Sequence, residues 1–313
     1  CDEQKLLKVI LFAFMENGIC SLREIEKFCR TDIRYMYLLD EMKAPTFATF
    51  GNLIRNELTV SIEQIFTDIN TYIFAKDHVD LQHTYIDGTK IEANANRYTW
   101  VWKKSCIKNR QKVFDKISVL IDAMNQEVLG YLGIKLEKRE EYAIDYVSEL
   151  LAMYKEGTGL DENSFVSGCG HRKSIQQKQY QELQGYLKRL KTYARHIEIC
   201  GNERNSYSKT DQDATFMRLK RDYMGNDQLL PAYNLQAAIC DEYIAVIDVK
   251  PYASDMECFV PLMEKFNRTY GHYPKYPVAD AGYGSYNNYL YCEEHGMEKY
   301  MKFTMYKKET TDP

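Results

Sequence analysis

Apolar positions in the first quarter of the chain recur at the spacing of helices. The run EQKLLKVILFAFMENG ends on Gly18, and SLREIEKFCR begins on Ser21, a helix N-cap residue with Glu24 three positions later. A third apolar segment, TFATFGNLIRNEL, follows Pro45. Short helices with tight connections of this kind are typical of a small bundle. We therefore predict an all-α N-terminal domain over residues 1–78.

The last part of this predicted domain has the outline of a DNA-binding motif. Two short helices would precede a third helix that carries, on mostly polar positions, Thr46, Thr49, Asn52 and Arg55. In a helix-turn-helix protein, a helix in that place enters the major groove. The same pattern fits a plain helical bundle that packs on the next domain, and the residues alone leave both interpretations open.

Helical spacing returns in a different form between residues 106 and 200. Two apolar seams alternate in steps of three and four, one from Val113 to Val128 and the other from Tyr180 to Ile197. We expect two long helices that pair as an antiparallel hairpin. The segment between them, residues 157–174, is rich in Gly and Ser and predicts a loop. Little chemistry is visible here, so we interpret residues 106–225 as a helical insertion with a structural role.

The period changes to that of β-strands in the C-terminal part of the chain. AYNLQAAIC and YIAVIDVK, separated by Asp241 and Glu242, predict an antiparallel hairpin. The later segments alternate between helix and strand: a helix at 254–271, a short strand at 275–279, a helix at 286–296 and a strand at 297–303. Together with an apolar strand at 83–87, this order predicts an α/β fold in which helices cover a mixed sheet.

Composition limits what the chain can be. Its 313 residues are 45% hydrophobic and 27% charged, as in a globular protein, and the net charge of −4 means that nucleic-acid binding would need local patches. Nine cysteines without a C-x-x-C pair predict a reduced, cytosolic chain, and Cys169 with His171 lacks the second ligand pair of a zinc site. The longest apolar run, residues 6–14, is too short to span a bilayer, so we expect no membrane partner.

Two acids stand in similar local settings. Asp87 and Asp280 each end a short apolar strand, and each is followed by a glycine within two residues. Carboxylates at one edge of an α/β sheet are suitable ligands for Mg²⁺, and a pair of such ions can promote phosphodiester displacement. Each acid also has a simpler explanation. Asp87 with Gly88 is a common hairpin-turn dipeptide, and Asp280 could cap the next turn.

A cationic and aromatic segment follows Asp87. No acid lies between Glu92 and Asp115, and the segment carries, as candidate DNA contacts, Arg97, Tyr98, Trp100, Trp102, Lys103, Lys104, Lys108 and Arg110. Cations neutralise phosphates, and aromatic faces stack on exposed bases. The alternative is an amphipathic strand whose aromatic residues pack on the core while its lysines face water.

Three long stretches taken together resemble bacterial insertion-sequence transposases of the Asp-Asp-Glu (DDE) class. They are YIDGTKIEANANRYTWVWKKS, SKTDQDATFMRLKRDYMGNDQLLPAYNLQAAICDEYIAVIDV and YPVADAGYGSYNNYLYCEEHG. The N-terminal helical segments similarly resemble the domain that precedes the catalytic region in those proteins. The matches occur in the same order over most of the chain, with the helical insertion as the vaguest part.

This resemblance implies a ribonuclease H-like catalytic domain over residues 79–313. Asp87 and Asp280 would be the first two acids of the triad and would bind Mg²⁺ or Mn²⁺. The implied activity is DNA transposition, in which metal-dependent hydrolysis at transposon ends precedes strand transfer into target DNA. The implied partners are DNA and a second copy of the chain for synapsis, and the implied location is the bacterial cytoplasm, at the nucleoid.

The third acid of the family does not have a clear counterpart. Glutamate is expected on a helix well beyond the strand at 297–303, whereas Glu293 and Glu294 precede that strand and Glu309 lies in a polar tail. We therefore assign no third acid and expect a fragment that ends before the catalytic Glu and has little activity. The alternatives are a DNA-binding or oligomerising remnant without catalysis and, more remotely, a metal-dependent nuclease.

Overall fold

The structure is a computed structural model that describes residues 2–40, 42–168, 170, 172–219, 225, 227–303 and 305. The chain divides into two compact units, Cys1–Asp80 and Leu81–Pro313. Within the described ranges, no helix is both long and apolar enough to cross a membrane.

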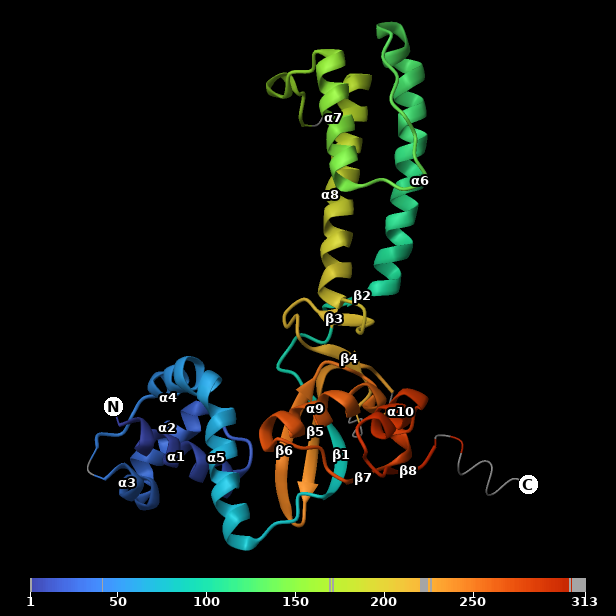
Figure 1. The fold of residues 1–313 in the computed structure, drawn as a ribbon. Coiled ribbons are helices and arrows are strands. Elements are labelled where there is room, and N and C mark those ends of the chain that lie inside the picture. Colours follow the sequence, from blue (N-terminus) through green and yellow to red (C-terminus); the bar gives the residue numbers. More distant parts are fainter. Residues whose placement is uncertain are drawn as a thin grey trace. The chain divides into compact units, whose positions relative to one another are not determined.

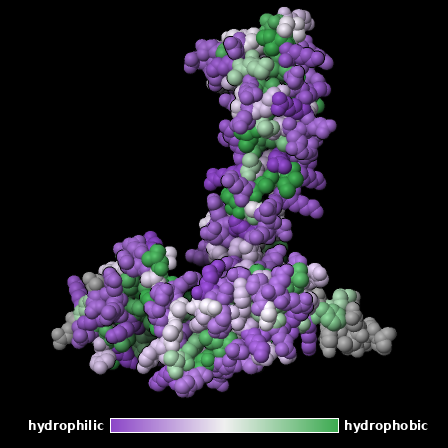
Figure 2. All heavy atoms as spheres, viewed as in Figure 1, coloured by the Kyte–Doolittle hydropathy of each residue, from purple (hydrophilic) through white to green (hydrophobic). Residues whose placement is uncertain are grey.

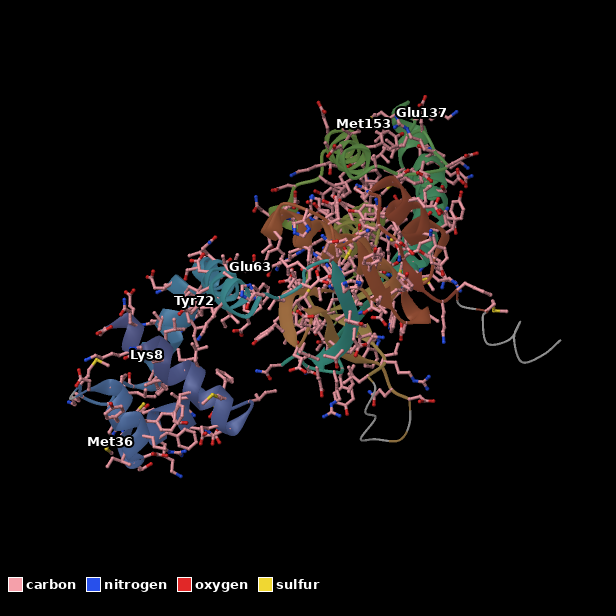
Figure 3. All side chains as sticks on the ribbon, turned by 60° about the horizontal axis from the view of Figure 1, so that its bottom comes forward. Lys8, Met36, Glu63, Tyr72, Glu137 and Met153 are labelled. Carbon is pink, nitrogen blue, oxygen red and sulfur yellow. The ribbon has the colours of Figure 1, made fainter. Side chains whose placement is uncertain are left out.

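The regular elements of the first unit, in its described part, are helices (Figure 1): α1 (Glu3–Asn17), α2 (Leu22–Thr31), α3 (Ile33–Leu39), α4 (Phe47–Leu53), the π-helical turn η1 (Ile54–Leu58) and α5 (Thr59–Asp77). The helix start predicted at Ser21 is confirmed, because Ser21 and Glu24 form a reciprocal capping box. A buried apolar cluster that includes Val9, Ile25 and Phe50 joins the first four helices. The labelled Lys8 and Met36 mark α1 and α3 in Figure 3.

The second unit contains a helical arm made of α6 (Lys103–Glu127), α7 (Ile144–Thr158) and α8 (Ile175–Cys200). The predicted packing of two long helices is confirmed, because α6 and α8 lie side by side, and α7 packs on α8 as a third helix (Figure 1). Their common core is apolar, with Ile117, Leu150 and Leu183 among its buried members. On the face seen in Figure 2, hydrophilic residues cover most of the arm and hydrophobic residues form patches between them.

A short two-stranded ribbon forms the base of this arm. β2 (Trp100–Trp102) leads directly into α6, and β3 (Ser206–Ser208) follows the end of α8. The two strands pair antiparallel. A small buried cluster, consisting of Val101, Cys106, Cys200 and Tyr207, joins the ribbon to both helices. The base of the arm is therefore fixed to the ribbon by apolar packing.

The main sheet is mixed, as the strand order in the sequence predicted. Its strands follow the order β4 (Thr215–Met217), β5 (Leu230–Cys240), β1 (His83–Glu92), β7 (Tyr276–Ala279) and β8 (Tyr300–Met301), and β6 (Tyr243–Lys250) also pairs with β5. Strand β5 is antiparallel to β1, β4 and β6, whereas β7 is parallel to β1 and to β8. β3 and β4 lie within the range 106–225, which the sequence marked as helical, and β4 belongs to the main sheet.

Helices cover this sheet. The predicted helices are confirmed as α9 (Phe259–Tyr270) and α10 (Tyr286–Glu294), and two short 3₁₀ turns, η4 (Asp255–Glu257) and η5 (Ala281–Tyr283), precede them. The apolar face of α9 is buried through Phe259, Met263 and Phe266, and the helix contacts β5 and β6. Pro261 lies in the first turn of α9, where its missing N–H breaks no helical hydrogen bond.

Candidate active site

Asp87 and Asp280 lie on neighbouring strands. Parallel pairing between β1 and β7 runs from His83 with Tyr276 to Ile86 with Ala279. Asp87 is the next residue of β1, and Asp280 directly follows the end of β7, at the point where this pairing stops. Neighbouring strands are about 5 Å apart, so the structure brings the two predicted acids together although they are 193 positions apart in the sequence.

The expectation that the first strand ends at Asp87 is wrong, and so is the hairpin-turn alternative for Asp87 with Gly88. β1 continues to Glu92, and its second half keeps its antiparallel pairing with β5, including Gly88 with Gln236. The parallel neighbour β7 stops at Ala279 while β1 goes on. The carboxylate therefore lies at the edge of the parallel pairing, in the middle of a longer strand.

Each of the two carboxylates is oriented by a nearby backbone N–H. Gly88 N donates to Asp87 Oδ1 at 2.8 Å, and Gly282 N donates to Asp280 Oδ1 at 2.8 Å. Asp280 is also the N-cap of η5, so the expected capping role is present at this position. Within the described part of the chain, no donor reaches the Oδ2 of either acid. Both side chains belong to exposed residues, so one oxygen of each is accessible to a ligand.

A third carboxylate, Asp255 of η4, borders the pair. A Cβ added at Gly282 would lie 2.8 Å from Asp280 Oδ1 and 3.8 Å from Asp255 Oδ2. Oxygens of both acids therefore converge on the same glycine. The Oδ1 of Asp255 accepts hydrogen bonds from Asn234 Nδ2 at 2.7 Å and from Gln236 Nε2 at 3.2 Å.

A buried polar network beneath the three acids holds Asp255 in place. Asn234 and Gln236 of β5 are 0% exposed and Tyr283 of η5 is 1% exposed. Gln236 Nε2 donates to Asn234 Oδ1 at 2.8 Å, and the Tyr283 hydroxyl donates to Gln236 Oε1. Because every member has a partner, the network can lie in the interior without the cost of an unpaired polar group.

The pKa of the Tyr283 hydroxyl is affected by all three acids. Burial raises the pKa of this phenol far above its usual range, and the negative charges of Asp255, Asp87 and Asp280 raise the pKa further. Tyr283 is therefore a neutral hydrogen-bond donor at any physiological pH. The three carboxylates are close enough to act on one buried group, which defines them as a single acidic site.

Gly88 makes room for the network. A Cβ at this position would lie 2.4 Å from Gln236 Nε2, closer than real atoms come. Glycine is therefore needed after Asp87 because the Gln236 side chain crosses β1 there, and the turn that the sequence suggested is not the reason. A larger residue at position 88 would displace the amide that supports Asp255.

The donor set suits a hard divalent cation. Asp87 and Asp280 offer carboxylate oxygens, and Mg²⁺ is commonly bound by one or two carboxylates with water and substrate phosphates completing the shell. Within the described residues, no group of three or more His, Cys, Asp or Glu is spaced to hold a metal ion alone. The residues present therefore fit an ion that keeps water or substrate ligands, and they do not fit a closed all-protein site.

The aromatic residues of the predicted DNA segment lie on the ribbon. Trp100 and Trp102 both contact the ring of Phe216, with centroid separations of 6.5 and 6.3 Å. Val101, between them, is buried, whereas Trp100 is 48% exposed and Tyr98 is 68% exposed. Packing on Phe216 thus occupies only part of each surface, and exposed aromatic faces are available.

The cations of this segment fall on different elements. Arg97 lies before the ribbon with its guanidinium 6.0 Å from the Tyr98 ring centroid, while Lys103, Lys104, Lys108 and Arg110 all lie in the first turns of α6. Lys103 Nζ donates to Gly201 O at 2.5 Å and so ties α6 to the end of α8. Arg110 stacks near Phe114 at 5.9 Å. Lys104 and Lys108 are exposed.

Sequence reasoning missed Asp255 and its supporting network. One signal was available, because Asn234 and Gln236 interrupt an otherwise apolar strand at alternate positions that face inward. Glu293 of α10, which the sequence did not favour as a third acid, pairs with Lys299 at 2.7 Å. Glu309, Cys169 and His171 lie outside the described residues.

Comparison with known proteins identifies the C-terminal part of the chain. Residues 204–312 match the family model for the transposase DDE domain, which confirms the resemblance to DDE transposases. The match contains Asp255 and Asp280, and Asp87 precedes it. No curated protein and no solved structure matches the chain.

Proposed function

We propose that this chain, which carries a transposase DDE domain match over residues 204–312, catalyses metal-dependent phosphodiester hydrolysis and strand transfer on DNA. Transposases of this kind act on DNA, and DDE proteins generally use divalent metal ions. The observation that carries the proposal is the adjacency of Asp87 and Asp280 at the end of the β1–β7 pairing. The family match contains Asp280, and the pairing of β1 with β7 brings Asp87 beside it.

The proposed roles follow from the contacts of each residue. Asp87 and Asp280 would hold Mg²⁺ or Mn²⁺ through their accessible oxygens, while Gly88 N and Gly282 N fix the orientation of each carboxylate. When bound, the ion supplies charge stabilisation at phosphorus and activation of the attacking water or 3′-hydroxyl. Asp255 adds negative charge beside the pair and is held by Asn234 and Gln236.

The remaining parts of the chain have corresponding proposed roles. Residues 79–313 would form a ribonuclease H-like catalytic domain, which the mixed sheet supports, with the helical insertion within residues 106–225. The ribbon and the start of α6 would contact DNA through the cationic and aromatic residues named above. Residues 1–78 would form an N-terminal domain with a DNA-binding role, and two copies of the chain would hold two transposon ends.

Metal binding is the first test of the proposal. We expect Asp87→Asn and Asp280→Asn each to weaken Mn²⁺ binding by more than about 100-fold, since loss of an outer-sphere partner alone costs 10–100-fold. Electron paramagnetic resonance titration of free Mn²⁺ measures this directly. The matched control is Asp145→Asn, which removes an exposed carboxylate from the start of α7 in the arm.

Chemistry on DNA is the second test. The protein is incubated with Mg²⁺ and a duplex that carries the terminal inverted repeats flanking its coding sequence, and nicked and joined products are resolved by gel. Products that depend on Mg²⁺, Asp87 and Asp280 support the proposal. DNA binding without Mn²⁺ binding would overturn it in favour of a non-catalytic DNA-binding protein, and cleavage without joining would favour a nuclease.

A further inference from the structure

A small surface cavity lies where the arm meets the ribbon. It has a volume of about 220 Å³ and is lined by residues of α8, of β3 and of the segment after β3: Thr192, Arg195, His196, Tyr207, Lys209 and Gln212. None of these residues belongs to the acidic site or to the cationic segment predicted from the sequence. The cavity is therefore a separate feature of the second unit.

The charge of the cavity is uncompensated. Arg195 and Lys209 contribute two cations, and no lining residue is a carboxylate. Among the described residues, neither side chain makes an ion pair or a side-chain hydrogen bond. This contrasts with cations elsewhere in the unit, such as Lys138, which pairs with Asp122 at 2.9 Å. Two unpaired cations that line one cavity leave room for an anion.

The histidine of the cavity adds a neutral donor. His196 Nδ1 lies 2.6 Å from the hydroxyl of Tyr207, which is buried. Burial lowers the pKa of His196, and the charges of Lys209 and Arg195 lower the pKa further, so the ring is neutral at pH 7. The neutral ring carries one N–H donor and one acceptor nitrogen, and the Tyr207 hydroxyl can match either state of Nδ1. The cavity then combines a guanidinium, an ammonium and a neutral imidazole.

We propose that this cavity binds one phosphodiester group of the DNA backbone. Guanidinium and ammonium groups are the usual partners of phosphate oxygens, and backbone phosphate contacts fix the register of a protein on DNA. The proposal rests on the proposed function, which supplies DNA as the partner, and it adds an anchor outside the acidic site.

The ribbon explains why DNA is the favoured source of the phosphate. Lys209 directly follows Ser208, which pairs with Trp100, and Lys209 N donates to Thr99 O at 2.9 Å. Lys209 of the cavity therefore directly follows the ribbon, whereas Arg195 and His196 come from α8. Trp100 pairs with Ser208 and Val101 with Tyr207, so the exposed aromatic surface and the cavity flank the ribbon on its two faces. A DNA strand can extend past both, whereas a free phosphate ion would use only the cavity.

Salt dependence of DNA binding tests this proposal. Binding of a fluorescent 20-base-pair duplex to the full chain is measured by anisotropy at a series of NaCl concentrations, in EDTA so that the acidic site holds no metal. Each phosphate contact contributes about 0.9 to the slope of log K against log salt. We expect Arg195→Gln and Lys209→Gln each to lower the magnitude of this slope by up to about 0.9. Arg195→Lys keeps the positive charge, so it should retain most of the wild-type slope.

The control variant is Lys138→Gln, which removes one cation from a different part of the arm and should leave the slope unchanged. Circular dichroism confirms that each variant is folded. Equal slopes in all variants would overturn the proposal. Broadening of the ³¹P signal of inorganic phosphate by wild type, with unchanged DNA slopes, would also overturn it and would assign the cavity to a free phosphate.

Failure here is distinct from failure of the proposed function. The assay contains no divalent metal, so Asp87 and Asp280 do not contribute to it. Unchanged slopes together with Mn²⁺ binding at the acidic site would reject the phosphate cavity alone. Lower slopes in the two glutamine variants without Mn²⁺ binding would reject the catalytic proposal alone.

Discussion

The helical arm and the main sheet are built on different interiors. The arm's core consists mainly of apolar side chains and aromatic rings, with Gln177 and Gln179 of α8 as buried polar members, and its charged residues pair at the surface, as Lys155 does with Glu162. The interior of the sheet region includes buried polar side chains, namely Thr84, Asn234, Gln236, Asp248 and Asn288. Both regions belong to the same unit of the chain, so the difference is not one of separate domains.

This difference suggests that the arm contributes mainly to stability, whereas the sheet region positions the groups of the acidic site. Apolar burial stabilises a helical arm through non-directional contacts, so it depends less on the exact position of a particular atom than hydrogen bonds do. A buried polar network is stable only when each donor and acceptor is matched, and it therefore holds side chains in fixed positions. The network sits beneath Asp255 and the pair of acids, where fixed positions matter most. Core changes in the arm should thus lower the free energy of unfolding without affecting Mn²⁺ binding. Changes in the buried polar network of the sheet should cost less stability but should weaken Mn²⁺ binding.

The largest expected effect lies in the core of the arm. We expect Ile117→Ala to lower the free energy of unfolding by about 2–5 kcal/mol, because Ile117 is 0% exposed within the apolar cluster and the change leaves a cavity. Urea unfolding followed by circular dichroism measures the loss. Mn²⁺ affinity at the acidic site should not change.

The control for this prediction is Val119→Ala on the same helix, since Val119 is 69% exposed and its loss should cost little. A fall in Mn²⁺ affinity in a folded Ile117→Ala protein would contradict the separation between the two regions.

Gln236 should give a smaller loss of stability and a loss of function as well. We expect Gln236→Met to cost about 1–3 kcal/mol, because the Tyr283 hydroxyl and Asp255 lose a buried partner. Mn²⁺ affinity should fall at the same time, since Asp255 is then held less firmly. Thermal unfolding and Mn²⁺ titration measure the two effects.

A double-mutant cycle sharpens this second prediction. Adding Tyr283→Phe to Gln236→Met removes the unmatched hydroxyl, so the pair should cost less stability than the sum of the single changes. Strict additivity would show that the two side chains are not coupled and would weaken the account of the network.

A substitution at Asp255 can remove its charge while keeping the shape of its side chain. Asp255→Asn keeps an oxygen that can accept from Asn234 and Gln236 but removes the negative charge beside Asp87 and Asp280. We expect little change in stability and a loss of about tenfold in Mn²⁺ affinity, as for other groups that surround a metal ligand. Calorimetric titration with Mn²⁺ measures this loss.

The neighbouring Glu257 provides the comparison for this variant. It lies in the same 3₁₀ turn and is exposed, so Glu257→Gln removes an equal charge from a residue that is not bonded to Asn234 or Gln236. Equal losses in the two variants would mean that only the overall charge of the region matters.

The sequence predicted many of the helices and strands and proposed the two acids from local signals, whereas α7, β3 and β4 were not predicted. An apolar run before Asp87 and another before Asp280 mark strands, and the Ser21 capping box marks a helix start. The adjacency of Asp87 and Asp280 follows from the parallel pairing of β1 with β7, which the order of elements made reasonable.

Asp255 was not accessible in the same way. Its position near the pair depends on β5 lying beside β1, which brings Gln236 next to Gly88 across 148 positions of sequence. The end of β1 was misjudged for a related reason. An Asp-Gly dipeptide predicts a turn, whereas here the glycine accommodates a side chain from the neighbouring strand. Long-range pairing outweighs the local turn preference.

The smallest expected effect concerns pH at the junction between the arm and the ribbon. The pKa of His196 is lowered in the fold by burial and by Lys209 and Arg195, so the unfolded chain takes up this proton at a higher pH than the folded chain does. The stability that His196 contributes is complete above about pH 6.5 and is lost as the pH falls through the lowered pKa. In His196→Gln, the decline in unfolding free energy between pH 7 and pH 5 should therefore be shallower than in wild type.

Urea unfolding at a series of pH values measures this decline. The control is His272→Gln, a change at an exposed histidine. Parallel curves for wild type and His196→Gln would show that the fold does not lower the His196 pKa. An added DNA phosphate should raise the His196 pKa by compensating the charges of Lys209 and Arg195.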